Sequence, residues 1–228
     1  MPFWAAWPWI GLVIAAAILV VLFRGRDNQN IASWNAVRLA WLLLPVYMLH
    51  QVEEHGIDML GRRYAFRADM CATFGYLDPA TCPIPISFIT TVNVGTVWSG
   101  ALIAALLASH RPLLGFVGWG IPLVNGVLHT VGSIAARSYN PGLLTSIVLF
   151  FPLGLLVARA AMRDQATGER GVVAMVIAGV LVHVILMGSL QLYLRARITE
   201  EALAIIQLLN AGVPTLVGLL LGQSRSRG

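Results

Sequence analysis

Long apolar stretches, separated by short polar segments, dominate the chain. Seven of them are about 20 residues long, the length that an α-helix needs to cross the hydrocarbon core of a bilayer. They cover residues 4–23, 34–55, 86–108, 113–134, 142–162, 171–194 and 202–221. The fourth and seventh stretches are interrupted by Gly and Pro, which membrane helices tolerate. The pattern predicts a single all-α domain over residues 1–228, a polytopic membrane helical bundle of about seven transmembrane helices.

The composition also favours a membrane protein over a soluble domain. Hydrophobic residues make up 58% of the 228 residues and charged residues only 11%, whereas soluble chains are about 25% charged. All 15 basic residues are Arg, and they are scattered over the loops without forming a stripe. Nucleic-acid binding is therefore not expected. The expected partners are membrane lipids and a hydrophobic small-molecule substrate, and the sequence does not indicate an oligomeric state.

The loop arginines predict an orientation, because cytoplasmic loops are enriched in positive charge. If the N-terminus lies outside, nine arginines fall on the cytoplasmic side and six on the outer side. The cytoplasmic set is Arg24, Arg26, Arg38, Arg111, Arg159, Arg163, Arg170, Arg225 and Arg227. We therefore expect an integral protein of the plasma membrane with an outer N-terminus and a cytoplasmic C-terminus.

An extended loop, residues 56–85, separates the second and third predicted spans. It contains Cys71 and Cys82, the only two cysteines of the chain, which would suit a disulfide in an oxidising compartment. Two unpaired thiols are the alternative. A metal site on the cysteines is not expected, because their separation is not a zinc-ligand spacing. The loop also holds three prolines and is predicted to form an ordered lid.

Ionisable residues at membrane depth gather at the end of the second span. His50 is followed three and four residues later by Glu53 and Glu54, so an imidazole and a carboxylate share one helix face. Such a pair can ligate a metal ion, or the carboxylate can orient the imidazole for proton transfer. The alternative is an ordinary helix end whose carboxylates meet water. His55 is an additional candidate in the same group.

A second polar group lies in the fourth span, where Asn125 and His129 are one helical turn apart. Counting spans places His129 and His50 at the same interface, each about 7–8 Å inside it. Tyr139 lies at that surface, before the fifth span. Two further candidates are Asn93 in the third span and His183 in the sixth, for which packed, hydrogen-bonded residues are the alternative.

These residues resemble the HXXEE-motif family of multi-pass membrane proteins, which are largely of unknown function. The motif that names the family is His-x-x-Glu-Glu and lies at residues 50–54. Two accompanying motifs match as well, Asn-x-x-x-His at residues 125–129 and Tyr-x-Pro-Gly at residues 139–142. The resemblance implies a polar intramembrane site and does not supply a substrate.

The sequence predicts a metal-dependent membrane enzyme that acts on a lipid or other hydrophobic substrate at the outer interface. His50, His129 and one of Glu53 or Glu54 would hold a divalent metal ion, with positions left open for water or substrate. Zinc would suit hydrolysis, and non-haem iron would suit oxidation. The other glutamate would be a general base or a ligand to a second metal ion.

Asn125 and Tyr139 complete the predicted catalytic set, because they could orient a water molecule or stabilise an oxyanion. Two other functions stay open. A metal-free isomerase or cyclase could use the same His and Glu residues as acid and base. A transporter or sensor could use them as a proton relay, although the sequence has no internal repeat of the kind that transporters usually show.

Overall fold

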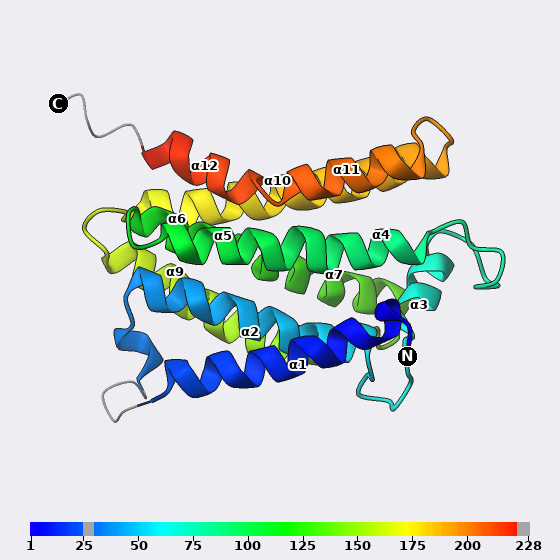
Figure 1. The fold of residues 1–228 in the computed structure, drawn as a ribbon, viewed down its shortest axis with the longest axis horizontal. Helices are drawn as coiled ribbons and strands as arrows, with labels where there is room; N and C mark the ends of the chain where they lie inside the picture. Colours follow the sequence, from blue (N-terminus) through cyan, green and yellow to red (C-terminus); the bar gives the residue numbers. More distant parts are fainter. Residues whose placement is uncertain (25–29, 223–228) are drawn as a thin grey trace.

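The computed structural model describes residues 1–24 and 30–222, which form a bundle of helices running along one long axis (Figure 1). The N-terminus and the last described helix, α12, end at opposite ends of this axis (Figure 1). The described residues contain no β-strand. Arg26, Arg225 and Arg227, which entered the prediction of orientation, lie outside the described residues.

Three of the long helices are single segments, and the other long helical runs are built from consecutive pieces. The single segments are α1 (Phe3–Leu22), α2 (Ala36–His55) and α10 (Glu169–Leu194). The composite runs are α4 (Ile86–Thr90), η3 (Thr91–Trp98) and α5 (Ser99–Leu107); α6 (Pro112–Val117) and α7 (Gly120–Ala136); α8 (Leu143–Thr145), η4 (Ser146–Phe150) and α9 (Phe151–Arg163); and α11 (Glu200–Asn210) with α12 (Val213–Gly222). Two short elements, η2 (Ile31–Ser33) and α3 (Phe66–Thr73), lie in connections. Both η3 and η4 are π-helical, a local widening that often accompanies functional sites.

Six helical runs of the described chain are long and apolar enough to cross a membrane. They are Phe3–Leu22, Ile86–Leu107, Pro112–Ala136, Leu143–Arg163, Glu169–Leu194 and Glu200–Gly222. Their ends agree with six of the predicted spans to within two residues. The remaining prediction, residues 34–55, forms α2, whose 20 residues are enough to span. Its polar residues, however, lower its hydropathy, so that it is not one of the six. The all-α fold is confirmed, and the predicted number of seven spans is not.

Helix α2 lies inside the bundle and carries its polar residues there. Of its 20 residues, 15 are buried, and it packs against α1, α5 and α6. The indole Nε1 of Trp119, which follows α6, donates a hydrogen bond to the carbonyl oxygen of Leu39 at 2.9 Å. Neighbouring helices therefore shield the polar half of α2 from lipid.

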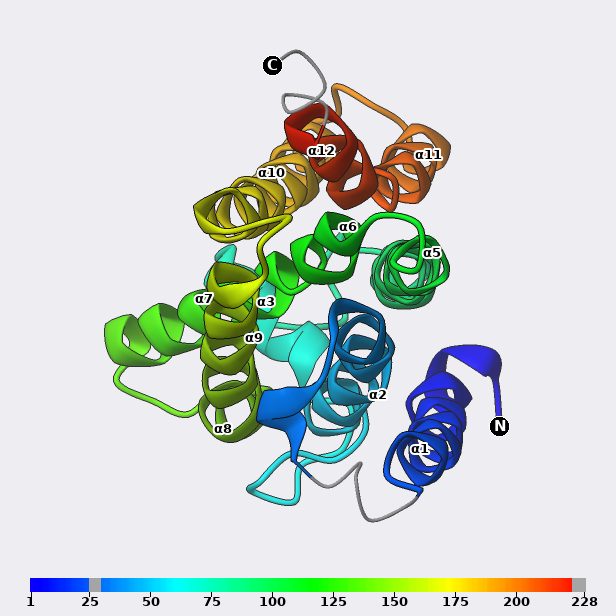
Figure 2. The ribbon, with the colours of Figure 1, turned by 90° about the vertical axis from the view of Figure 1, so that its left-hand side faces the viewer.

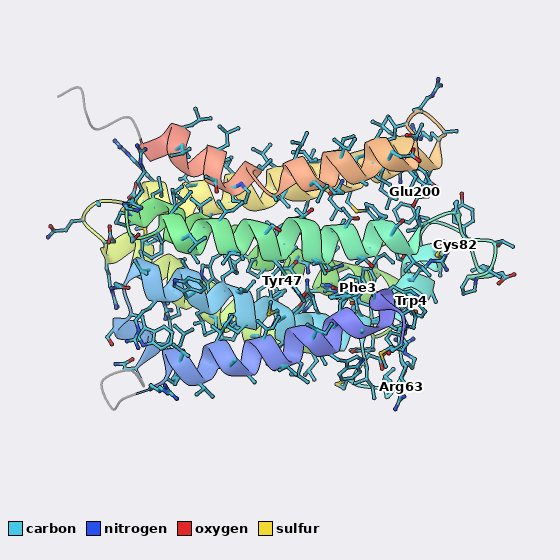
Figure 3. The ribbon with its side chains drawn as sticks, in the orientation of Figure 1. Phe3, Trp4, Tyr47, Arg63, Cys82 and Glu200 are labelled. Carbon is cyan, nitrogen blue, oxygen red and sulfur yellow. A yellow bond between two sulfur atoms is a disulfide. The ribbon has the colours of Figure 1, made fainter. Side chains whose placement is uncertain are left out.

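The connection between α2 and α4, the segment predicted to be a lid and called the lid below, is folded and lies at the end of the bundle where the N-terminus is. Cys71 of α3 and Cys82 form a disulfide. Arg67 donates hydrogen bonds to the carbonyl oxygens of Pro79, Cys82 and Ile84, at 3.0, 2.9 and 3.0 Å. Figure 3 shows Cys82 at the same end of the molecule as Trp4, Arg63 and Glu200. This connection is thus an ordered segment at one end of the bundle.

Helices α7 and α10 cross at two glycines and then separate. A Cβ atom on Gly120 would lie 1.7 Å from the carbonyl oxygen of Met175, and one on Gly179 would lie 2.2 Å from the carbonyl oxygen of Gly120. The backbones therefore touch at this point, as small residues allow in membrane helices. Towards the lid end the two helices diverge (Figures 1 and 2).

Candidate metal centre

Three buried side chains from α2 and α7 converge near the lid end of the bundle. They are His50, Glu54 and His129, with ligand atoms all within 4.8 Å of one another. Glu54 lies between the two imidazoles. Its Oε2 is 3.5 Å from Nε2 of His50, and its Oε1 is 3.3 Å from Nε2 of His129. The predicted pairing of His50 with a glutamate one helical turn away is thus present in α2, and the partner is Glu54.

The outer nitrogen of His129 is held by Asn140 from the turn before α8. Nδ1 of His129 and Oδ1 of Asn140 are 2.8 Å apart. The Asn140 amide also donates from Nδ2 to the carbonyl oxygen of His129 at 2.8 Å, which fixes the orientation of the amide. Because an amide oxygen only accepts, Nδ1 of His129 carries the proton. In the neutral imidazole, the lone pair of Nε2 then points at Glu54.

The outer nitrogen of His50 is held in an equivalent way by Thr145 and Glu53. Nδ1 of His50 is 2.8 Å from the hydroxyl oxygen of Thr145, and this hydroxyl lies 2.5 Å from Oε2 of Glu53. The Thr145 hydroxyl donates its proton to the carboxylate, so it accepts from Nδ1–H of His50. The lone pair of Nε2 of His50 therefore also faces Glu54, and this chain of hydrogen bonds orients the imidazole.

Glu53 points away from the cluster and caps the next helix. Its oxygens accept hydrogen bonds from the backbone N–H groups of Leu144 and Thr145, at 3.0 and 2.7 Å. A carboxylate at this place is also stabilised by the positive end of the helix dipole. Tyr139 donates its hydroxyl to Oε1 of Glu53 at 2.6 Å and accepts from the N–H of Met59 at 3.2 Å. Burial and the hydrogen bond to Glu53 raise the pKa of Tyr139, so it serves as a neutral donor.

Gly142 explains the glycine of the Tyr-x-Pro-Gly motif. Its φ of +96° lies in the left-handed region, which favours glycine. A Cβ atom there would lie 2.7 Å from Cε1 of His129 and 2.8 Å from Cε1 of His50. The missing side chain therefore leaves room for both imidazoles.

Two other predicted residues touch the cluster. The amide Nδ2 of Asn125 is 3.2 Å from Nε2 of His50, so it approaches the same lone pair. Nε2 of His55 is 2.9 Å from Oε2 of Glu54, although the two groups are not aligned for a hydrogen bond. His55 contacts the ring of Trp7 at a tilted angle and the ring of Phe66 edge-on, with ring centroids 5.1 and 4.6 Å away.

A cavity of about 80 Å³ begins at Glu54 and Asn125 and continues between α3, η3, α7, α10 and α11. Most of its lining is apolar. Two of the predicted residues, Asn93 and His183, also line it. His183 lines the cavity but is not a member of the cluster. Its Nδ1 donates a hydrogen bond to the carbonyl oxygen of Gly179 at 2.8 Å.

The side chain of Asn93 is hydrogen-bonded to Gln51, a residue that was not predicted from the sequence. Nε2 of Gln51 donates to Oδ1 of Asn93 at 2.9 Å, and Oε1 of Gln51 accepts from Nε1 of Trp98 at 2.6 Å. Gln51 follows His50 directly, and the 100° step between them turns its side chain towards η3 instead of the cluster.

The residues that orient the two imidazoles were also missed from the sequence. Asn140 and Thr145 are polar residues in or just after the Tyr-x-Pro-Gly motif. Their position in or beside that motif was the one sequence signal that could have pointed to them. Neither residue type suggests a metal site by itself.

Comparison with protein families gives one match. A family model described as a protein of unknown function with HXXEE motif matches residues 41–157. This segment is 117 of the 228 residues and contains every member of the cluster. Neither curated proteins nor solved structures yield a match. The resemblance expected from the sequence is confirmed, and the chain belongs to the family of HXXEE-motif proteins.

Proposed function

We propose that the protein is a metal-dependent integral membrane enzyme whose centre is formed by His50, Glu54 and His129. One observation carries the proposal. Both imidazoles commit their Nδ1 protons to outward partners, so two nitrogen lone pairs and a carboxylate face one another. Asn125 supplies a donor to only one of these groups, Nε2 of His50, so a cation among the three would relieve the remaining repulsion between buried acceptors.

The spacing of the three groups supports a metal ion as that cation. A tetrahedral zinc ion bound at about 2.0–2.1 Å separates its ligand atoms by roughly 3.3–3.4 Å. Oε2 of Glu54 lies 3.5 Å from Nε2 of His50, and Oε1 lies 3.3 Å from Nε2 of His129. One ligand atom from each of the three residues lies within 4.8 Å of the others, so the side chains would draw together around a bound ion. Two histidines and one carboxylate leave coordination positions open, as catalytic zinc and non-haem iron sites do.

The protein residues around the centre would divide the work as follows. A bound divalent metal ion would activate a water molecule or polarise a substrate oxygen. Asn125, which already approaches His50, would orient the reacting group. Glu53 and Tyr139 hold the N-terminus of α8 and, through Thr145, the ring of His50, so we assign them positioning roles. In this assignment neither is the general base nor a ligand.

The cavity supports a hydrophobic substrate. Glu54 and Asn125 line it beside the cluster, and most of its other lining side chains are Leu, Ile, Val, Met and Phe. Zinc in the centre would make the reaction a hydrolysis, and iron would make it an oxidation. The identity of the metal therefore decides the reaction class.

One observation favours a second candidate, a metal-free acid–base enzyme. His55 brings a third imidazole to Glu54, at 2.9 Å. If the cation of the site is a proton, Glu54 and a protonated imidazole would form an acid–base pair suited to an isomerase or cyclase.

For the location we propose a plasma membrane with the lid end outside. The Cys71–Cys82 disulfide supports this orientation, because disulfides persist in oxidising compartments. The N-terminus lies at the lid end (Figure 1), so it would be outside as well.

Elemental analysis of the purified protein tests the metal centre. Wild type, Glu54→Ala, His129→Ala and the control His110→Ala are purified without chelator after growth with zinc and iron supplied. His110 is exposed in the turn before α6, so its replacement should leave the metal content unchanged. We expect stoichiometric metal in wild type and control, and loss of it in the other two. Full metal in both cluster variants would refute the centre, and a metal-free wild type would favour the acid–base enzyme.

A further inference from the structure

We propose that the cavity binds the single hydrocarbon chain of a membrane amphiphile, which enters sideways from the bilayer between α7 and α10. This inference deepens the proposed function and rests on it for the chemistry at the polar end. The binding of the chain follows from the cavity itself.

The cavity lies where α7 and α10 diverge. The two helices are in backbone contact at Gly120 and Gly179. Residues one turn or more beyond this crossing line the cavity, Asn125 on α7 and His183 and Leu186 on α10. The crossing therefore closes one end of the space between the helices, and their separation opens the other.

The mouth of the cavity faces the lipid side of the bundle. Among the lining residues that the structure describes, Met187 alone is exposed, at 39%. Other exposed side chains on the same two helices are apolar as well, with Val184 61% exposed on α10 and Leu128 46% exposed on α7. A substrate that passes Met187 would therefore come from hydrocarbon and not from water.

The size and lining of the cavity restrict its ligand. Its volume is about 80 Å³, well below the roughly 300–1,000 Å³ of pockets for drug-sized molecules. Such a space holds a short segment of a narrow, flexible chain, the rest of which would stay in the bilayer, whereas it does not hold a fused ring system. The wall formed by η3 and α4 contributes apolar side chains, including Val92 and Phe88, together with the polar side chains of Asn93 and Thr96.

His183 offers a contact for the polar end of the amphiphile. Its Nδ1 donates to the carbonyl oxygen of Gly179, because a carbonyl can only accept. The lone pair therefore lies on Nε2, which has no hydrogen-bond partner in the described part of the chain. Nε2 can accept a hydrogen bond from a hydroxyl or amide N–H, and Glu54 and Asn125 line the same cavity. We therefore infer that the ligand is a long-chain alcohol, amide or related amphiphile carrying a donor near its reacting group.

Photolabelling with a long-chain fatty alcohol that carries a diazirine on its chain tests this inference. The full-length protein in lipid nanodiscs should be labelled on η3 and α10. Leu186→Trp and Val92→Phe fill the cavity from opposite walls and should each lower the labelling about tenfold. Val184→Trp introduces the same side chain on the outer face of α10, adding at least as much bulk as Leu186→Trp, and should change nothing. Excess unlabelled fatty alcohol should compete, and a sterol should not.

Metal analysis of the same samples separates this inference from the proposed function. His129→Ala should lose metal and keep the labelling, because it does not line the cavity. Labelling of a wild type that holds no metal would leave the chain-binding site standing and remove the metalloenzyme. Metal-loaded wild type whose labelling is unaffected by both cavity-filling variants would overturn the chain-binding site.

Discussion

Glu53 and Glu54 are adjacent in the chain, yet their carboxylates act at different places. Glu54 lies between His50 and His129, and Glu53 accepts four hydrogen bonds at the start of α8. The 100° rotation between neighbouring helical residues accounts for the difference. The double glutamate of the motif therefore combines one candidate ligand with one helix anchor.

Replacing Glu53 should therefore mainly lower the stability of the protein, whereas replacing Glu54 should mainly abolish metal binding. Glu53→Gln weakens charge-assisted hydrogen bonds to the helix N-terminus, so we expect a loss of about 2 kcal/mol in the free energy of unfolding. Glu54→Gln should have a smaller effect on the metal-free protein and should abolish metal binding. Denaturant unfolding in detergent, combined with elemental analysis, measures both quantities. Equal metal loss in the two variants would contradict this division.

Gly142→Ala should disturb the centre without removing any ligand. The new Cβ would collide with Cε1 of both His50 and His129, and alanine disfavours the positive φ. We expect metal affinity to fall at least as much as in His129→Ala. Gly132→Ala is a suitable control, because its Cβ would meet only one atom, at 3.7 Å. Undiminished metal binding in Gly142→Ala would show that the imidazoles move freely.

Tyr139 should make the stability of the protein depend on alkaline pH. Burial and Glu53 raise its pKa, so the folded state holds the phenol proton more tightly than the unfolded chain does. The resulting stabilisation is complete below the usual tyrosine pKa of about 10 and is lost as the pH rises above it. Tyr139→Phe should be less stable at neutral pH and should show a shallower alkaline decline in Tm. Parallel declines in the two proteins would disprove this role.

The glycine contact between α7 and α10 should tolerate no side chain. Gly179→Ala would force a Cβ against the carbonyl oxygen of Gly120, whereas Gly188→Ala, farther along α10, meets nothing within 4 Å. We expect Gly179→Ala to lower Tm and the yield of folded protein strongly, and Gly188→Ala to leave both unchanged. Size-exclusion chromatography and thermal unfolding compare them. Similar behaviour of the two variants would rule out close helix contact at this point.

The lid should become more mobile when either the Cys71–Cys82 disulfide or the hydrogen bonds of Arg67 are removed. The disulfide closes a short loop, and loss of such a bond typically costs about 2–4 kcal/mol. The double variant Cys71→Ala with Cys82→Ala, and separately Arg67→Leu, should raise hydrogen exchange over α3 and the rest of the lid. Exchange at the α7–α10 crossing serves as the internal reference. Unchanged exchange in the lid would indicate that packing alone holds it.

Much of the fold follows from the sequence, because hydrophobic length is a strong signal in a membrane protein. The span predicted at 171–194, for example, is α10 at Glu169–Leu194. Helical periodicity likewise paired His50 with a glutamate and Asn125 with His129. Periodicity alone did not separate Glu53 from Glu54, since that depends on where α8 begins relative to α2.

Other parts of the site depend on contacts between distant segments. Asn140 reaches His129 through a turn, and Thr145 reaches His50 from a different helix. Asn93, a further candidate from the third span, lies on another side of α2, where Gln51 binds it. Depth in the membrane can be estimated from span parity, whereas rotation about the bundle axis is set by side-chain packing.

The polarity of α2 bears on how the protein is made. A helix that carries Arg38, Glu53 and Glu54 gains little by leaving the translocon for lipid alone, and 15 of its 20 residues end up against other helices. Its insertion should depend on neighbours that are synthesised after it, including α5, α6 and α7. The His and Glu residues would then be exposed to water or held by the insertion machinery until the later helices arrive. Assembly of the centre would coincide with completion of the bundle.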